Sequence, residues 1–232
     1  MKIKVDILLG FLNSGKTTLI NLFLNSGEIE DELVVIIQYE NGKEKIVKKS
    51  KNVIVIKRKN SDYFDKELLN FILREYMPDR IIIEYNGNSN TKEFIKSFKE
   101  KPIGRICTIH KIINVIDIRK ANIFFLNRNR KVENQAINSD IIILNNALNV
   151  DKLMVRNLRK HIRHINRCAR IIEFSDEEEQ REAVENMKLC LNSENEKLNK
   201  QAVLLLLCVI VIFIGIILYV PLCDNVIDLL ME

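Results

Sequence analysis

The sequence predicts an α/β fold, in which a doubly wound, mostly parallel sheet carries helices on both faces, followed by a C-terminal transmembrane helix. Through residue 175, short apolar runs of strand length alternate with helical segments, which is the pattern of βαβ units. Residues 202–223 follow a different pattern, 22 consecutive residues without a charge. The predicted organisation is an α/β domain at 1–175, a linking helix at 176–201, the transmembrane helix at 202–223 and a short acidic tail at 224–232.

Local signals define each element of the predicted domain. The expected strands are the apolar runs at 3–9, 33–38, 53–57, 80–84, 106–117 (one or two strands), 140–144 and 169–174. Helices are expected at 16–25, 62–76, 92–99, 118–138 with a polar interruption, and 151–164. Asp62 caps the second helix and Pro78 follows its end, whereas Ser175 and Glu178 form a capping box where the linking helix begins.

A glycine-rich turn joins the first strand to the first helix. Residues 10–17 read G-x-x-x-x-G-K-T, the phosphate-binding loop, so the fold is of the P-loop NTPase type. The glycines let backbone N–H groups point at phosphate oxygens, and the helix N-terminus adds to the attraction. Lys16 is expected to reach the β- and γ-phosphates as a catalytic residue, and the Thr17 hydroxyl to ligate Mg²⁺. The expected nucleotide-binding residues of the loop are Gly10, Asn13, Ser14, Gly15, Lys16, Thr17 and Thr18.

Two further segments end strands at the same edge of the predicted sheet. Glu84 ends the strand at 80–84 and Gly87 follows three residues later, as in the second metal-binding motif of nucleotide hydrolases. We expect Glu84 to be a catalytic residue that holds Mg²⁺ with the loop threonine, and the Gly87 amide to bind the γ-phosphate. Glu40 follows the second strand, in the place of a first switch loop, and is a candidate for a further Mg²⁺ ligand. A plain polar turn at Asn41-Gly42 is the alternative for this segment.

Composition narrows the classes of function. The five cysteines include no C-x-x-C pair, which predicts neither a disulfide framework nor a zinc site. The net charge is +5, and because three acids lie beyond residue 201, the rest of the chain carries +8. This charge suits an anionic membrane face or an acidic partner. Nucleic acid is not an expected partner, because no basic run is interleaved with aromatic residues.

The apolar segment predicts a single membrane span. As a helix, residues 202–223 would be roughly 33 Å long, enough to cross a bilayer core, and they lack the polar stripe that a core helix of this length carries. Lys197 and Lys200 precede the segment, whereas only acids follow it. The positive-inside rule therefore predicts a single-pass protein of the cell membrane with its N-terminal domain in the cytoplasm.

With these motifs in place, the sequence resembles the CobW-like GTPases, relatives of the accessory GTPases that serve hydrogenase and urease metal centres. The resemblance covers roughly residues 3–175. Its motifs are the phosphate loop at 10–19, E-x-G at 40–42, E-x-x-G at 84–87, a strand ending in aspartate at 114–117, the run at 139–145 and the segment at 165–172. It implies a domain that binds and slowly hydrolyses GTP with Mg²⁺, and it places Asn145 in the guanine-binding motif.

The chain departs from this family pattern in three ways. The guanine motif N-K-x-D is replaced by Asn145-Asn146-Ala147-Leu148, and leucine cannot accept the hydrogen bonds that the family's aspartate takes from guanine. The family's Cys-x-Cys-Cys metal motif is absent, since no cysteine precedes Cys107, which argues against a role in metal trafficking. The membrane segment also stands where the family has a C-terminal domain.

Together these observations predict a membrane-anchored GTP-binding protein, a nucleoside triphosphatase that binds and slowly hydrolyses GTP. Its expected partners are GTP or ATP, the membrane, a membrane protein and a second copy of the chain. The alternative is a non-hydrolysing or ATP-binding regulatory subunit of a membrane complex such as a transporter. No residue is an obvious general base, so fast hydrolysis would need a partner that completes the site.

Overall fold

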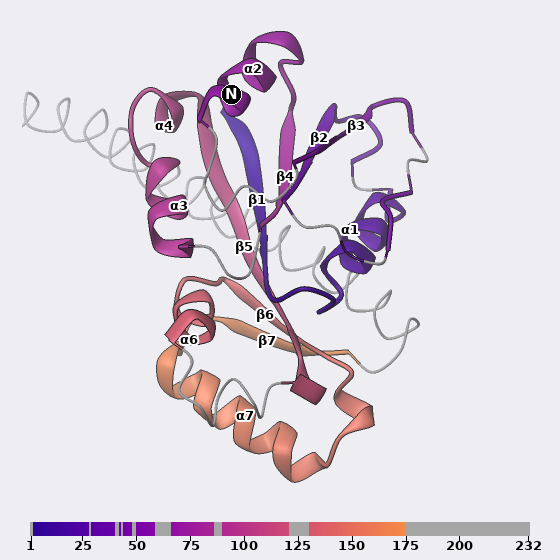
Figure 1. Ribbon diagram of the computed structural model, residues 1–232, viewed down its shortest axis with the longest axis vertical. Helices are drawn as coiled ribbons and strands as arrows, with labels where there is room; N and C mark the ends of the chain where they lie inside the picture. The colour runs from indigo at the N-terminus through magenta and orange to yellow at the C-terminus, as the bar shows by residue number, and fades with distance from the viewer. Residues whose placement is uncertain are drawn as a thin grey trace, which may run out of the picture. The chain divides into compact units, whose positions relative to one another are not determined.

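The computed structural model describes residues 2–27, 29–39, 42, 44–47, 50–58, 66–85, 90–120 and 130–174 (Figure 1). All of these residues belong to one compact unit, Met1–Val184. The predicted linking helix, transmembrane helix and acidic tail lie outside the described residues. Within the described ranges, no helix is long and apolar enough to cross a membrane.

The described strands form one seven-stranded sheet in the order β3-β2-β4-β1-β5-β6-β7, and every pairing is parallel. The strands are β1 (Ile3–Leu9), β2 (Val34–Gln38), β3 (Val53–Lys57), β4 (Arg80–Glu84), β5 (Cys107–Asp117), β6 (Ile141–Asn145) and β7 (Arg170–Glu173). The segment predicted to hold one or two strands is the single strand β5. The predicted parallel α/β sheet is thus confirmed, with strand ends within one residue of those expected at most positions.

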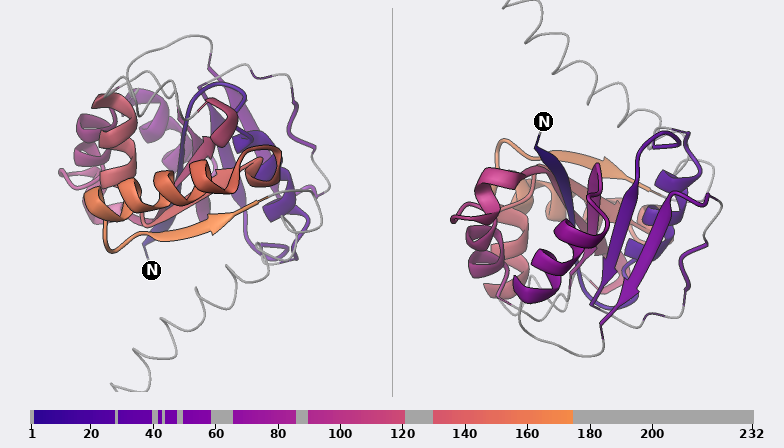
Figure 2. Two further views of the ribbon diagram at one scale, coloured as in Figure 1. Left: turned by 90° about the horizontal axis from the view of Figure 1, so that it is seen from below. Right: turned by 90° about the horizontal axis from the view of Figure 1, so that it is seen from above.

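The described helices connect these strands. They are α1 (Lys16–Leu24), α2 (Lys66–Glu75), α3 (Thr91–Ser97), α4 (Ile103–Ile106), α6 (Arg130–Ile137) and α7 (Lys152–Ile165), with a 3₁₀ turn η1 at Ala147–Asn149. Among them α1 lies alone on one face of the sheet, whereas α2 and α3 lie on the other (Figures 1 and 2). Sequence periodicity did not predict α4 or η1, because elements of three or four residues carry no periodic pattern.

The core explains why the strands read as unbroken apolar runs. All five residues of β2 and of β4 are buried, as expected for parallel strands covered on both faces. One apolar cluster joins alternate residues of β1, namely Val5, Ile7 and Leu9, to α2 and α3. A second cluster joins Leu158 and Ile162 of α7 to Ile142 and Leu144 of β6. These contacts fix β1 at the centre of the sheet, so the loop that follows it starts from a rigid strand.

An ionic network with a buried centre, Arg80 and Asp6, and partly exposed outer members lies on the α1 face, towards the amino ends of the strands. Arg80 of β4 forms ion pairs with Asp6 of β1 and with Glu32, and its guanidinium lies 5.6 Å from the centre of the Phe23 ring. Asp6 also contacts Nδ1 of His110 at 2.8 Å, and Lys4 pairs with Glu32 at 2.9 Å. Asp6, the one acid inside the first apolar run, is therefore matched by a buried cation from the neighbouring strand.

This network makes stability depend on pH. Burial disfavours the charged form of Glu32, but the hydrogen bonds and charges of Arg80 and Lys4 outweigh it and hold the pKa of this carboxyl below its ordinary value of 4.5. Since the folded-state pKa is the lower one, the stabilisation is complete above the unfolded-state pKa. It is lost as the pH falls through the folded-state pKa.

We expect Arg80→Met to lower the free energy of unfolding at pH 7 by about 3–5 kcal/mol, because it leaves Asp6 and Glu32 without their shared partner. The difference from the wild type should shrink below pH 4.5, where Glu32 is protonated in the unfolded chain. Chemical denaturation at pH 7 and pH 3.5 measures both values. Arg74→Met, on the exposed side of α2, is the control; a loss of the same size there, or a difference that does not change with pH, would contradict the assignment.

Candidate functional site

The glycine-rich turn after β1 closes tightly against two other strands. Gly10 has φ of +134°, and a Cβ added there would lie 2.3 Å from the carbonyl oxygen of Val115 in β5. Gly15, which precedes α1, has φ of +105°, and its added Cβ would lie 2.4 Å from Nδ2 of Asn145 in β6. Both positions thus require glycine for conformation and for space. The loop therefore fits only against this arrangement of β5 and β6.

Lys16 lies across this loop. Its side chain is 2% exposed, and Nζ donates hydrogen bonds of 2.9 Å to the carbonyl oxygens of Gly10 and Phe11. These bonds hold the ammonium group inside the curve of the backbone, next to the first turn of α1. The positive charge and the N-terminus of α1 thus face the same space, which suits phosphate oxygens.

Glu84 lies at the end of β4, beside β1, and is buried. Its Oε1 accepts a 2.7 Å hydrogen bond from the Thr17 hydroxyl, and its Oε2 accepts a 2.6 Å bond from Nε2 of Gln38 at the end of β2. The sequence predicted that Glu84 would lie beside Thr17. It did not single out Gln38, although a buried amide that ends an apolar strand is a usable signal. Carboxylate, hydroxyl and amide thus meet at the carboxyl edge of three strands.

The segment after β2 lies along α1. A Cβ added to Gly42 would lie 3.8 Å from the Thr17 hydroxyl oxygen and 3.9 Å from Oδ1 of Asn13. Further on, Thr18 donates to Glu44, and the side chain of Asn21 bonds the backbones of Lys45 and Val47. The predicted switch segment therefore approaches the phosphate loop. Its candidate ligand, Glu40, and the predicted γ-phosphate contact, Gly87, lie outside the described residues.

Asn145 connects the phosphate loop to the expected base-binding segment. Its Nδ2 donates a 2.9 Å hydrogen bond to the carbonyl oxygen of Ser14, and its Oδ1 accepts one of 2.9 Å from the backbone N–H of Asn146. Asn146 has φ of +63° and directs its Nδ2 to Oδ1 of Asp117 at 3.3 Å. The sequence singled out Asn145 by resemblance. The contacts of Asn146 depend on a left-handed backbone that the sequence does not show.

Asp117, at the end of β5, is held as a carboxylate. Burial raises its pKa, but hydrogen bonds and charge from Arg119 outweigh that effect, and the net result is a pKa below the ordinary 3.8. Arg119 contacts it through Nε at 3.0 Å and Nη2 at 2.8 Å. Asp117 is therefore ionised at neutral pH, paired with Arg119, and accepts the hydrogen bond that orients Asn146 at the carboxyl edge.

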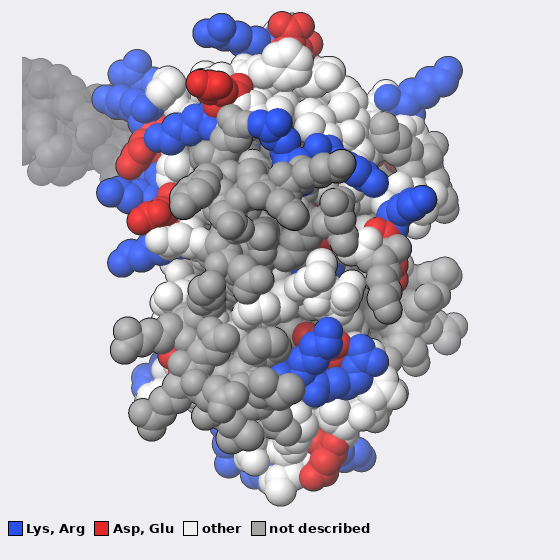
Figure 3. All heavy atoms as spheres, viewed as in Figure 1, with Lys and Arg blue, Asp and Glu red and all other residues white. Residues whose placement is uncertain are grey.

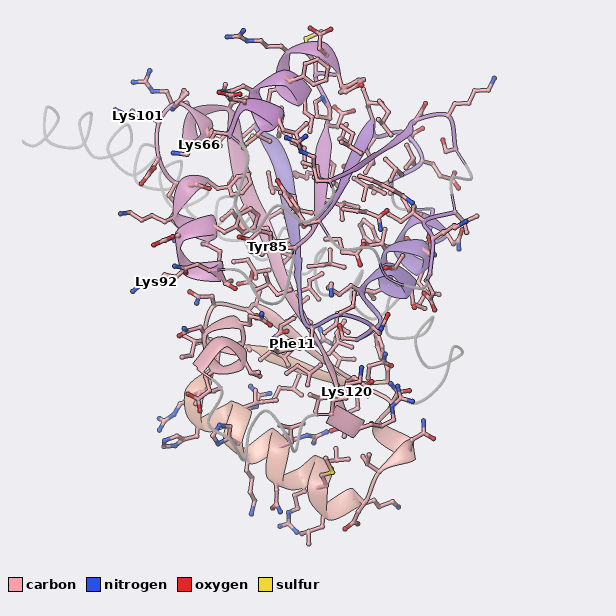
Figure 4. The ribbon with its side chains drawn as sticks, in the orientation of Figure 1. Phe11, Lys66, Tyr85, Lys92, Lys101 and Lys120 are labelled. Atoms are coloured by element: carbon pink, nitrogen blue, oxygen red, sulfur yellow. The ribbon has the colours of Figure 1, made fainter. Side chains whose placement is uncertain are left out.

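A small pocket lies behind the phosphate loop, between it, β5 and α6. Phe11 lines it from the loop and Lys120 from the segment after β5 (Figure 4). Asn114 also lines it and is 1% exposed, and neither polar atom of its side-chain amide has a hydrogen-bond partner among the described residues. The same holds for the hydroxyl of Ser14. The pocket thus supplies polar groups directly beneath the loop.

The described residues contain no group of three or more His, Cys, Asp or Glu side chains that could hold a metal ion. The two cysteines among them are free thiols, one buried and one exposed. Burial raises the pKa of the Cys107 thiol to about 11, so this cysteine is neither a nucleophile nor a ready metal ligand at neutral pH. Near the phosphate loop, the described residues instead offer oxygen atoms, those of the Thr17 hydroxyl and the Glu84 carboxylate, which are the ligand type that hard cations prefer.

A parallel sheet, a G-K-T loop after its central strand and an acidic residue at the end of the neighbouring strand define a P-loop nucleotide-binding protein. A family model described as "CobW/HypB/UreG, nucleotide-binding domain" matches residues 4–173. The chain belongs to this family, as its motifs predicted. Among curated protein sequences, none matches the chain.

Solved structures share this fold. The Zn(II)-bound YjiA GTPase from E. coli superimposes with a TM-score of 0.56 at 22% identity, over 75% of this chain and 57% of that one. The hydrogenase maturation factor HypB from Archaeoglobus fulgidus gives 0.53 at 14% identity, over 82% and 90%. HypB from Helicobacter pylori in complex with nickel gives 0.51 at 12% identity, over 83% and 88%. The chain thus spans little more than half of YjiA and most of HypB, and at these identities the likeness shows the fold alone.

We expect Gly10→Ala to destabilise the domain far more than Gly27→Ala, although both residues have positive φ. The added methyl at Gly10 meets the backbone of β5 at 2.3 Å, whereas at Gly27 the nearest atom is the Glu30 side chain at 3.7 Å. Gly27→Ala should therefore lower the free energy of unfolding by only about 1–2 kcal/mol, the cost of a positive φ for a residue that has a Cβ. Gly10→Ala should lower it by several kcal/mol more, because the methyl group also clashes with β5. Urea denaturation gives both values, and equal losses would show that the loop is not packed on β5 as described.

Proposed function

We propose that this protein is a membrane-anchored P-loop GTP-binding protein that binds GTP with Mg²⁺ and hydrolyses it slowly. The observation that carries the proposal is the convergence of Lys16, Thr17 and Glu84 at one end of the sheet. Membership of a nucleotide-binding family supports the same assignment. Lys16 and the loop amides would stabilise charge on the β- and γ-phosphates, and Gly87 would contact the γ-phosphate from its own loop.

The residues at the carboxyl edge fit a magnesium ion. Mg²⁺ prefers oxygen ligands, and the Thr17 hydroxyl and the Glu84 carboxylate are 2.7 Å apart in a buried position. Glu40, after β2, is the candidate for a further ligand. A bound Mg²⁺ would neutralise negative charge on the phosphates. Gln38 would keep Glu84 oriented, since it occupies the carboxylate oxygen that Thr17 does not.

GTP is favoured over ATP by the family motifs; YjiA, which shares the fold, is named a GTPase. Asn145 keeps the first position of the guanine motif and packs on the loop. Leu148 takes the place of the aspartate that would bind guanine, so the preference is expected to be weaker than in proteins with N-K-x-D. The alternative is a non-hydrolysing or ATP-binding regulatory subunit of a membrane complex. The presence of Leu148 in place of the aspartate favours this alternative.

A metal-carrier role has less support. YjiA is described with zinc and one HypB with nickel, but this chain has no cysteine before Cys107. The nucleotide domain is proposed to face the cytoplasm from the cell membrane, with residues 202–223 as its single span. Lysines precede that segment and only acids follow it, and this difference in charge supports the orientation. A membrane protein or a second copy of the chain is the proposed protein partner.

Nucleotide binding and turnover test the core of the proposal. With Mg²⁺ present, the wild type should bind a fluorescent GTP analogue more tightly than its ATP counterpart and release phosphate slowly. Lys16→Ala should abolish binding, whereas Lys92→Ala, at an exposed position on α3, should leave it unchanged. Binding without phosphate release would favour the regulatory-subunit alternative. Failure to bind either nucleotide would overturn both functions.

Extraction of membranes tests the anchor separately. The full chain should stay in the membrane pellet after washing with alkaline carbonate, because an apolar span is held by burial in the bilayer and not by charge. A version that ends at residue 201 should move to the supernatant. Release of the full chain by carbonate would remove the anchor from the proposal and leave nucleotide binding untouched.

A further inference from the structure

The outer face of α7 is the most uniformly charged helix face among the described residues. The helix contains five Lys or Arg residues and no acid: Lys152, Arg156, Arg159, Lys160 and Arg163. At 3.6 residues per turn these positions fall within an arc of about 100°. All five side chains are exposed. The cations therefore form one continuous stripe, called here the α7 basic face.

Packing fixes the direction of this face. On the opposite side of the helix, Leu158 is 6% exposed and Ile162 fully buried against β6. The basic face must therefore point away from the sheet. Seen from below, α7 is not covered by any other described element (Figure 2), and Lys and Arg side chains project from the lower end of the space-filling view (Figure 3).

Most of this charge is left without neutralisation by described residues. Arg159 pairs with Glu173, and Arg163 donates to the carbonyl oxygens of Arg167 and Ala169. The side chains of Lys152, Arg156 and Lys160 have no hydrogen bond or ion pair within the described part of the chain. They are spaced four residues apart, so like charges face each other along the helix, an arrangement that is unfavourable in isolation. An anionic surface laid against the face would remove this repulsion.

We propose that the α7 basic face docks on the anionic headgroups of the membrane in which the chain is anchored. The short distance along the chain to the predicted span supports this partner. The described part of the domain extends through Phe174, after β7, the strand beside β6, and 27 residues of sequence separate Phe174 from the predicted span. Exposed Leu153 adds an apolar group next to Lys152. The helix has no Phe, Tyr or Trp that could stack on bases, which disfavours nucleic acid. The inference rests on the proposed anchor for its choice of partner.

The expected consequence is a domain held in one orientation on acidic lipid. Each Lys or Arg near an anionic leaflet strengthens binding about fivefold, and the effect disappears in high salt. The full chain is therefore placed in nanodiscs of phosphatidylcholine alone or with phosphatidylserine. Lysine acetylation is then measured by mass spectrometry. Lys152 and Lys160 should be labelled several-fold more slowly in the anionic discs, and 0.5 M salt should remove the difference. Lys92 and Lys101, exposed on and beyond α3 (Figure 4), should not respond to lipid.

Two double variants with reversed charges test whether the residues of the α7 basic face are responsible. Arg156→Glu with Lys160→Glu should abolish the protection of Lys152, whereas Arg74→Glu with Lys92→Glu, the same charge change on α2 and α3, should preserve it. Equal labelling in both lipids would overturn the proposal. So would protection of Lys152 in both lipids, which would mean that the chain's own acidic run at 176–179 covers the face.

A third experiment tests the α7 basic face independently of the proposed membrane span. If carbonate releases the full chain, the anchor is wrong, and flotation with vesicles containing phosphatidylserine then decides the role of α7. Salt-sensitive flotation whose affinity falls by at least about 30-fold in the Arg156→Glu, Lys160→Glu variant would uphold the basic face, since two cations are lost and two acids are added. Absence of flotation, or flotation unchanged in the variant, would refute it.

Discussion

The buried carboxylate of Glu84 is the interaction on which the site depends. One oxygen accepts from Thr17 and the other from Gln38, so a single side chain joins β4 to the first turn of α1 and to the end of β2. A buried carboxylate without donors would be costly, and here both oxygens are satisfied by neutral groups. The bonds place the phosphate loop and the start of the switch segment in fixed relation before any ligand binds.

The fold was predictable because the apolar runs and the motifs of the sequence indicate the same order of strands and helices. Apolar runs of strand length are buried on both sides, and the G-K-T loop fixes the order of strand, turn and helix at the centre of the sheet. The pairing of Asp6 with Arg80 was less evident. The sequence presents them as two isolated charges, and only the register of β1 against β4 brings them together.

The candidate site was predictable where a motif names the residue and less so where geometry selects it. Lys16, Thr17 and Glu84 follow from their motifs, and the structure places Glu84 beside Thr17. Gln38 and Asn146 carry no motif. Gln38 reaches Glu84 because β2 and β4 are neighbours in register, and Asn146 reaches Asp117 through a left-handed backbone. Contacts of this kind arise from tertiary structure and have no local pattern.

The central place of the first strand has a consequence for how the chain acquires its structure. In the sheet, Lys4 of β1 lies opposite Arg80 of β4, and Ile3 lies opposite Cys107 of β5. The first strand therefore meets its neighbouring strands only after long stretches of chain have been added. Non-local parallel pairing of this kind makes folding slow. The loop is completed later still, when Asn145 closes on Ser14. The phosphate loop is first along the chain, but it can reach its final contacts only when the chain as far as Asn145 is present, and until then the apolar residues of β1 lack the elements that bury them.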